Sequence, residues 1–398
     1  MGKQLLITLI ACIGGFVFGS DVGLVNKIQT YDSFKKLFAP LDNAKLGLMV
    51  ATLLFGCMIG SLGSSYIAEA YGRKKAIIIG SVIFTAGVFT QISAVAGYNV
   101  LLLGRFFTGL AVGILSTVVP MYLSEVCDPE KRGMLVSCQQ LAITLGILVS
   151  FLAAMATEKV QVLGLADWQF AIVLQLIPAG LLFFGMLTLP SSPRWLLSKR
   201  RHEDAKIALA KLRGLSFKHV EGEYYQLKSD AEAETEQLGW GAAWQQYRSR
   251  IMIGILIQMF QQISGINGLM YYSTKMYGSL LPDYVDALAA AQNIMNVVAT
   301  IPALFLVDRL GRRSLLLAGS AGCAIGLFCT ATAMLLPTPL PVPAVVGIFI
   351  FIVNFAYAIG PLPWVLFDLF RLCVQKSFQV AFVQKLLQQV QRLIGFLI

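Results

Sequence analysis

The sequence predicts an all-α integral membrane protein, and three observations support this prediction. Hydrophobic residues make up 57% of the 398 residues and charged residues only 13%, so a soluble globule of this composition would expose too much apolar surface. Apolar runs long enough to cross about 30 Å of hydrocarbon recur along the chain. The basic residues between these runs gather on one side if the runs cross the membrane alternately.

Ten apolar runs qualify as membrane spans. They lie near residues 4–25, 46–68, 76–97, 100–124, 134–156, 169–189, 251–272, 287–307, 314–336 and 343–366. We expect the first run to be a span and not a removed signal peptide, because it lacks a small-residue cleavage site and many further runs follow. The loops rich in arginine and lysine are expected in the cytoplasm, together with the N-terminus.

The charge pattern divides the chain into two halves. Residues 190–249 are polar and carry both signs of charge, which predicts short cytoplasmic helices between a six-helix bundle at 1–189 and a second bundle at 250–366. Gly72-Arg73-Lys74 follows the second span and Gly311-Arg312-Arg313 follows the eighth, 239 positions later. This equal placement indicates an internal duplication.

Composition also excludes several classes of function. The net charge of +10 is spread over short loops, which suits membrane topology and anionic lipid better than nucleic acid. The seven cysteines lack metal-ligand spacing and are expected to be small packing residues. Both histidines, His202 and His219, fall in the cytoplasmic segment, and no catalytic constellation or phosphate-binding loop assembles around them. We therefore expect no enzyme, metal, cofactor or nucleic-acid partner.

The apolar run from 251 to 272 contains an unusual polar stretch, Gln261-Gln262-Ile263-Ser264-Gly265-Ile266-Asn267. An amide without a partner in a nonpolar medium costs roughly 2–7 kcal/mol, so these groups must face protein, water or a polar solute. On an unbroken helix Gln262 and Asn267 would lie about 140° apart. A bend at Gly265 would bring them together.

Several motifs, in their usual order, resemble those of the sugar porter branch of the major facilitator superfamily over residues 8–365. They are Gly72-Arg73-Lys74, Gly104-Arg105, Pro120-Met121-Tyr122-Leu123-Ser124-Glu125 with Arg132-Gly133, Pro190-Ser191-Ser192-Pro193-Arg194-Trp195-Leu196, Gln261 to Asn267 with Tyr271-Tyr272, Asp308 to Arg313, and Gly360-Pro361-Leu362-Pro363-Trp364. The resemblance implies a two-bundle transporter of a hexose-like sugar working by alternating access, with sugar:proton symport favoured over facilitated diffusion. We expect a monomer in the plasma membrane whose partners are the sugar and lipid, with a proton as the coupling ion.

The resemblance implies a set of sugar-binding residues. They are Gln140, Gln261, Gln262, Asn267, Asn296 and Trp364. Amides suit sugar hydroxyls because both groups donate and accept hydrogen bonds. As alternatives, Gln140 and Asn296 could form interhelical hydrogen bonds worth about 0.6 kcal/mol, and Trp364 could be an interfacial anchor.

Asp21 and Arg105 are the candidates for proton coupling. Asp21 lies roughly 24 Å along the outward-running first span, and Arg105 is near the start of the inward-running fourth span, so the two can pair in the outer part of the membrane. The family's proton symporters resemble this chain in having an aspartate at this position. An acid held ionised by Arg105 and freed when neutral could carry a proton with the sugar. The alternative is a purely structural ion pair.

The resemblance also implies a cytoplasmic gate made of charged residues. Its members are Glu69, Arg73, Glu125, Arg132, Arg194, Asp308, Arg312 and Arg313, with ordinary solvated loop charge as the alternative. Ser191 stands where the family usually has an acid, and Gln169 where an arginine often follows the tryptophan. We expect these two neutral residues to thin the gate network and to make the state closed toward the cytoplasm less stable.

The family pattern stops after Val365, where the relatives continue into an eleventh and a twelfth span. Residues 367–398 instead predict an amphipathic tail, rich in glutamine and basic residues. A shifted reading frame, an alternative splice or a faulty gene model would explain the abrupt change. Two further functions stay open: a non-transporting sugar receptor, against which the short tail argues, and an inactive transporter lacking its last helices.

Overall fold

The structure is a computed structural model, and it describes residues 2–127, 132–160, 164–233, 240–336 and 340–363. These residues are almost entirely helical, as predicted. The N-terminal half contains α1 (Gly2–Ile28), α2 (Asp32–Leu37), α3 (Asn43–Tyr71), α4 (Arg73–Ile92), α5 (Tyr98–Val126), α6 (Arg132–Thr157), α7 (Asp167–Val173) and α8 (Leu176–Thr188). The linker forms α9 (Pro193–Ser198), α10 (His202–Arg213) and α11 (Phe217–Ala233). The C-terminal half contains α12 (Trp240–Ile263), α13 (Ile266–Leu280), α14 (Val285–Arg309), α15 (Arg312–Leu335), α16 (Pro341–Asn354) and the π-helix η4 (Phe355–Ile359).

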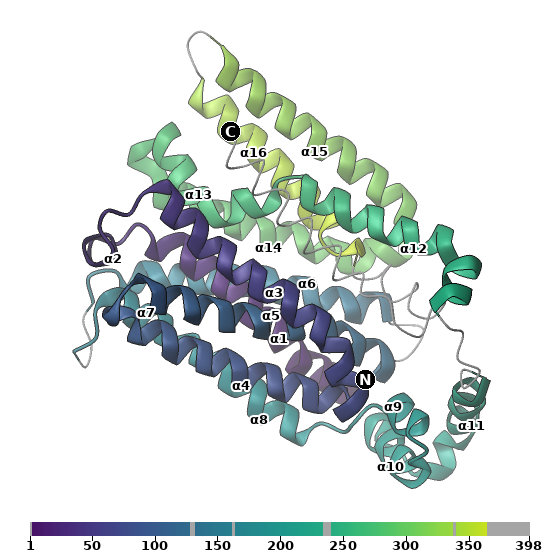
Figure 1. The fold of residues 1–398 in the computed structure, drawn as a ribbon. Coiled ribbons are helices and arrows are strands. Elements are labelled where there is room, and N and C mark those ends of the chain that lie inside the picture. Colours follow the sequence, from purple (N-terminus) through teal and green to yellow (C-terminus); the bar gives the residue numbers. More distant parts are fainter. Residues whose placement is uncertain (1, 128–131, 161–163, 234–239, 337–339, 364–398) are drawn as a thin grey trace.

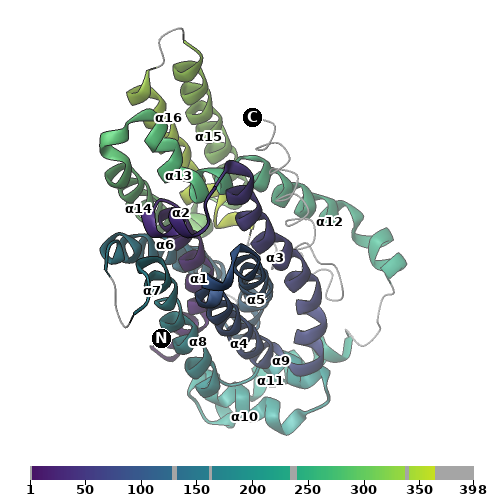
Figure 2. The ribbon, with the colours of Figure 1, turned by 60° about the vertical axis from the view of Figure 1, so that its left-hand side comes forward.

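Nine helical segments in the described part of the chain are long and apolar enough to cross a membrane. One of them joins α7 and α8 into a single span from Asp167 to Thr188. The predicted span at 251–272 is divided between α12 and α13, which meet at Gly265. Figures 1 and 2 show the two halves side by side, with α13 to α16 in one and α3, α4 and α5 in the other.

Glycines allow the helices of the N-terminal half to touch backbone to backbone. A Cβ atom on Gly19 of α1 would overlap the carbonyl oxygen of Ile143 on α6. A Cβ on Gly109 of α5 would likewise overlap the carbonyl oxygen of Leu53 on α3. Small residues at such contacts favour helix association in membranes, where no hydrophobic driving force acts between helices.

The two halves share local features at equivalent positions. Gly72 and Gly311 precede α4 and α15 with positive φ angles of 89° and 78°. Gly87 and Gly326 are separated by the same 239 positions. A Cβ on Gly87 would lie 2.7 Å from the backbone nitrogen of Thr108 on α5, and a Cβ on Gly326 would lie 2.6 Å from that of Phe351 on α16. These parallels are what an internal duplication requires.

The linker helices lie at the end of the molecule that also holds the start of α1 (Figure 1). They pack on the N-terminal half: the indole nitrogen of Trp195 donates to the carbonyl oxygen of Glu69 at 3.0 Å, and Arg213 donates to that of Val126 at 3.1 Å. Arg213 also pairs with Glu223, which ties α10 to α11. The predicted short helices between the halves are therefore present.

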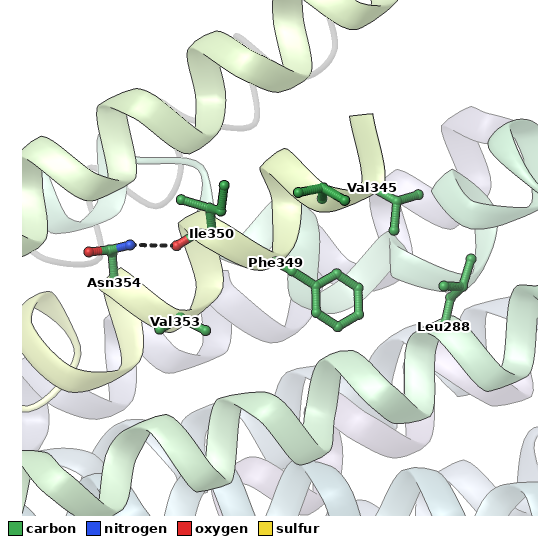
Figure 3. Close-up of a pocket in the computed structure, with 7 residues that line it drawn as sticks. Leu288, Val345, Phe349, Ile350, Val353 and Asn354 are labelled. Atoms are coloured by element: carbon green, nitrogen blue, oxygen red, sulfur yellow. Dashed lines mark hydrogen bonds between the residues drawn. The ribbon is translucent and has the colours of Figure 1, made fainter. Parts of the chain in front are cut away.

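The C-terminal half contains an apolar cavity of about 530 Å³ between α14 and α16 (Figure 3). Its walls include Leu288, Val345 and Phe349. The amide nitrogen of Asn354 donates to the carbonyl oxygen of Ile350, 2.8 Å away on the same helix. In the N-terminal half, α3 and α5 occupy the places that α14 and α16 occupy in the C-terminal half. The backbones of α3 and α5 touch at glycines, whereas α14 and α16 are separated by the cavity.

Candidate functional site

The polar stretch forms a break between α12 and α13. Gly265 has φ 87° and ψ 5°, a left-handed conformation that glycine adopts without steric cost. The break lets the amide nitrogen of Asn267 donate to Oε1 of Gln262 at 2.6 Å. The predicted bend at Gly265, and the meeting of these two amides, are confirmed.

Amides from both halves meet at the end of η4. Nε2 of Gln261 donates to the carbonyl oxygens of Ile359 at 3.0 Å and Gly360 at 3.4 Å. Gln140 of α6 approaches the same glycine, because a Cβ on Gly360 would lie 3.2 Å from its Nε2. A π-helical turn such as η4 occurs often at functional sites. Gly360 therefore marks where the N-terminal and C-terminal halves face each other with polar groups.

A second group of polar side chains joins α13 and α14. The amide nitrogens of Gln292 and Asn296 lie 3.9 Å and 4.0 Å from the sulfur of Met270. The hydroxyl of Tyr277 donates to Oε1 of Gln292 at 2.6 Å. Sequence reasoning missed Gln292 and its neighbour Asn293. The sequence signal that could have identified them is the presence of amides inside the apolar run 287–307, as for residues 261–267.

Some of these polar atoms have no protein partner among the described residues. Oε1 of Gln261 and both amide atoms of Asn293 are buried without a hydrogen bond. Leaving such a group unsatisfied costs about 1–3 kcal/mol. A ligand hydroxyl could satisfy these atoms, because it both donates and accepts. Trp364 lies outside the described residues, and the sugar-binding roles of all six residues stay predictions.

Asp21 and Arg105 form an ion pair that is completely enclosed. Nη1 of Arg105 lies 2.6 Å from Oδ1 of Asp21, and the two side chains are 1% and 0% exposed. Nε of Arg105 also donates to the carbonyl oxygen of Met49 at 3.4 Å. Oδ2 of Asp21 has no partner in the part of the chain that the structure describes. The predicted pairing is confirmed, whereas its role in coupling stays a prediction.

Contacts between the halves surround the C-terminal end of α1. Nζ of Lys27, with its side chain 3% exposed, lies 2.8 Å from the carboxylate of Asp286 and 3.0 Å from that of Glu158. The amide nitrogen of Asn26 donates to the Ser273 hydroxyl at 2.6 Å. The bonds to Asp286 and Ser273 join α1 to α14 and α13, so the two halves are in contact there, whereas Glu158 follows α6 in the N-terminal half. This role of Lys27 could not be predicted from the sequence.

The predicted gate residues lie at the opposite end of the molecule. Arg73 and Glu125 form an ion pair at 3.0 Å, and Arg73 also donates to the carbonyl oxygen of Ala68 at 3.2 Å. Two of the other side chains are exposed, those of Glu69 and Arg313. Arg194 and Arg312 are half-buried, and the side chains of Arg132 and Asp308 lie outside the described residues.

Gln169 does not lie at this gate, so the expectation that its neutral side chain thins the gate network is wrong. Its Nε2 donates to the carbonyl oxygen of Ile92 at 2.7 Å, and its Oε1 accepts from the backbone nitrogen of Ala166 at 3.0 Å. The physical reason is position: Gln169 is near the start of the span Asp167–Thr188, whereas Ser191 follows its other end.

The family model described as "Sugar (and other) transporter" matches residues 7–394. The chain belongs to this family. The match extends beyond Val365, where the motif resemblance ends, so the family assignment does not stop at the predicted tail.

Sequence relatives and one solved carrier structure resemble this member of the sugar transporter family. The galactose-proton symporter of Escherichia coli K12 is 33% identical over 372 residues, which cover 90% of this chain and 77% of that one. The human proton myo-inositol cotransporter is 32% identical over 83% of this chain and 51% of its own length. The solved proton:xylose symporter XylE bound to 6-bromo-6-deoxy-D-glucose has a TM-score of 0.88 at 25% identity, covering all of this chain and 89% of that one. The major facilitator fold is thus confirmed.

Proposed function

We propose that the protein transports a monosaccharide across a membrane by alternating access, coupled to a proton. Its family is one of transporters, and the relatives named above are proton-coupled carriers of galactose, myo-inositol and xylose. One observation carries the proposal: Gln140 from the N-terminal half and Gln261 from the C-terminal half meet at Gly360. A solute bound there would contact both moving halves.

The proposed sugar contacts are Gln140, Gln261, Gln262, Asn267, Asn296 and Trp364. Each neutral hydrogen bond contributes only about 0.5–1.5 kcal/mol net, so several are needed for selective binding and none prevents release. Because the contacts come from both halves, closing the halves around the sugar would complete the site. A carrier of this design binds its solute with moderate affinity on either side.

The proposed coupling uses Asp21 and Arg105. While Asp21 is ionised, the pair is held together in a low-dielectric interior, where the attraction is strong. Protonation of Asp21 removes that attraction and frees α1 from α5. A proton bound with the sugar on the outer side would then be released on the inner side. The Arg73–Glu125 pair and the other gate residues would close the cytoplasmic end while the outer side is open.

Uptake of radiolabelled sugars by cells that lack their own carriers tests this proposal. We expect saturable uptake of at least one of galactose, glucose, xylose and myo-inositol, and faster uptake when the outside is made acidic. We place the chain in the plasma membrane as a monomer with a cytoplasmic N-terminus, which surface labelling and size measurement would check. If every labelled solute entered at the same rate as in cells without the protein, at every pH, the proposal would be refuted.

A second candidate function is sugar sensing without transport. The high glucose sensor RGT2 of Saccharomyces cerevisiae is 33% identical over 81% of this chain, although the alignment covers only 44% of that sensor. A purified protein that binds sugar but supports no uptake in liposomes would favour this candidate over transport.

A further inference from the structure

Three charged side chains meet where the two halves touch at the C-terminal end of α1. Nζ of Lys27 lies 2.8 Å from both carboxylate oxygens of Asp286 and 3.0 Å from Oε2 of Glu158. An ammonium group has three N–H donors, and these three oxygens can accept all of them. We call Lys27, Glu158 and Asp286 the charge cluster.

The charge cluster is divided unequally between the halves. Lys27 and Glu158 belong to the N-terminal half, whereas Asp286 belongs to α14 of the C-terminal half. Both acids contact the same nitrogen, so their nearest oxygens lie within roughly 6 Å of each other, a range in which like charges repel. Lys27 therefore attracts Asp286 and also neutralises the repulsion between the two acids.

The helix ends show which charges are favoured at their positions. Lys27 is in the last turn of α1 and Asp286 is in the first turn of α14, and the helix dipole favours both charges there. Glu158 follows the C-terminal end of α6, where the dipole disfavours a negative charge. The stabilisation of Glu158 at this position therefore comes from Lys27.

The burial of Lys27 shows what happens when the halves separate at this point. Its side chain is only 3% exposed, and a buried ammonium without a charged partner is strongly destabilising. Asp286 would leave with α14, but Glu158 is on the same half as Lys27 and would stay beside it. Separation of the halves therefore breaks one ion pair of the charge cluster and keeps the other.

We propose that the charge cluster is an electrostatic latch between the halves, and that Lys27 determines its sign. With the ammonium present, the acids of the two halves are held together; without it, they push the halves apart. The latch opens by exchange of partners, since Lys27 leaves Asp286 and keeps Glu158. Its part in alternating access rests on the proposed function, but the latch itself can be measured without any transport.

Ser273 can report on the latch, because its side chain is fully buried and accepts a hydrogen bond from Asn26 of the other half. The assay measures how fast Ser273→Cys reacts with a water-soluble maleimide, in the purified chain in lipid nanodiscs. The chain without this substitution is the blank for the native cysteines. We expect Lys27→Gln to speed the reaction roughly tenfold. Asp286→Asn should speed it less, because it leaves no acid opposite Glu158.

The deciding variants are the double substitutions. Adding either Glu158→Gln or Asp286→Asn to Lys27→Gln removes the repulsion between the halves. Each double variant should therefore react about threefold more slowly than Lys27→Gln alone. A lysine that only fills space would give no such rescue, because a second substitution would then be neutral or add further damage.

The matched control is Lys275→Gln. Lys275 is an exposed lysine of α13 that also bonds across the halves, but its partner is the neutral side chain of Asn43. This control should change the reaction rate by less than about twofold. Thermal unfolding of each variant shows whether it is folded.

Two results would overturn the latch. One is an unchanged reaction rate in folded Lys27→Gln, and the other is a pair of double variants that react as fast as Lys27→Gln or faster. If uptake is normal and either of these results appears, the latch fails and the proposed function stands. If the expected rates appear but no sugar is taken up, the proposed function fails and the latch stands.

Discussion

Replacing Asp21 by asparagine removes one charge from a buried ion pair with an N–O distance of 2.6 Å. Both side chains are almost fully enclosed, so Arg105 would be left as a buried cation facing a neutral amide. Removing one partner of a buried pair costs about 3–5 kcal/mol. We expect the variant to be less stable and to lack the site at which a proton binds and leaves.

Accumulation of labelled sugar in proteoliposomes measures this coupling. One pH unit corresponds to 1.36 kcal/mol, so a gradient of one unit, acidic outside, supports about tenfold accumulation if one proton accompanies each sugar. The unmodified protein should approach this ratio. Asp21→Asn should equilibrate the sugar without accumulating it, while sugar exchange across the membrane persists.

The control is Asp42→Asn, which removes an exposed acid that caps α3 and should leave accumulation unchanged. The double variant Asp21→Asn with Arg105→Gln removes both charges, and we expect it to regain part of the lost stability. Accumulation by Asp21→Asn equal to that of the unmodified protein would refute the assignment of coupling to this pair.

Three further changes test the geometry of the site. Gly265→Ala forces a side chain into the left-handed backbone region, and it should lower the free energy of unfolding by about 1–2 kcal/mol. The control Gly268→Ala, in α13, should not destabilise the protein. Equal effects of the two substitutions would contradict the role of the break at Gly265. Lys27→Gln removes the ion pair with Asp286 that joins the halves, and should speed the reaction of Ser273→Cys with an impermeant maleimide. An unchanged rate would mean that Lys27 does not hold the halves together. Gln261→Leu should weaken sugar binding about tenfold, or about 1.4 kcal/mol. The control Gln91→Leu removes an amide of α4 that bonds to α5 away from the site, and it should have little effect. Similar losses of affinity in the two variants would argue against a specific contact between Gln261 and the sugar.

The sequence alone predicted features that depend on residues close together in the chain or at the same depth in the membrane. The bend at Gly265 followed from amides and a glycine inside an apolar run, and it needs only helix geometry and the cost of burying polar groups. The matching depth of Asp21 and Arg105 in the first and fourth spans allowed them to pair, and the family resemblance selected this pair.

Features that depend on the meeting of distant helices could not be predicted in this way. The bonds from Lys27 to Asp286 and from Asn26 to Ser273 could be predicted only by knowing that the C-terminal end of α1 faces α13 and α14. The family pattern groups Gln169 with the gate residues, but Gln169 lies near the start of the span Asp167–Thr188 and the gate lies beyond the other end of that span.

The claim that buried amides from both halves handle a sugar is tested most directly by entry of a radiolabelled monosaccharide into liposomes that contain only the purified protein. The account predicts saturable entry of at least one of galactose, glucose, xylose and myo-inositol, several-fold faster than into protein-free liposomes and slowed by Gln261→Leu. Entry of all four solutes at the protein-free rate, with a folded protein in the membrane, would contradict it.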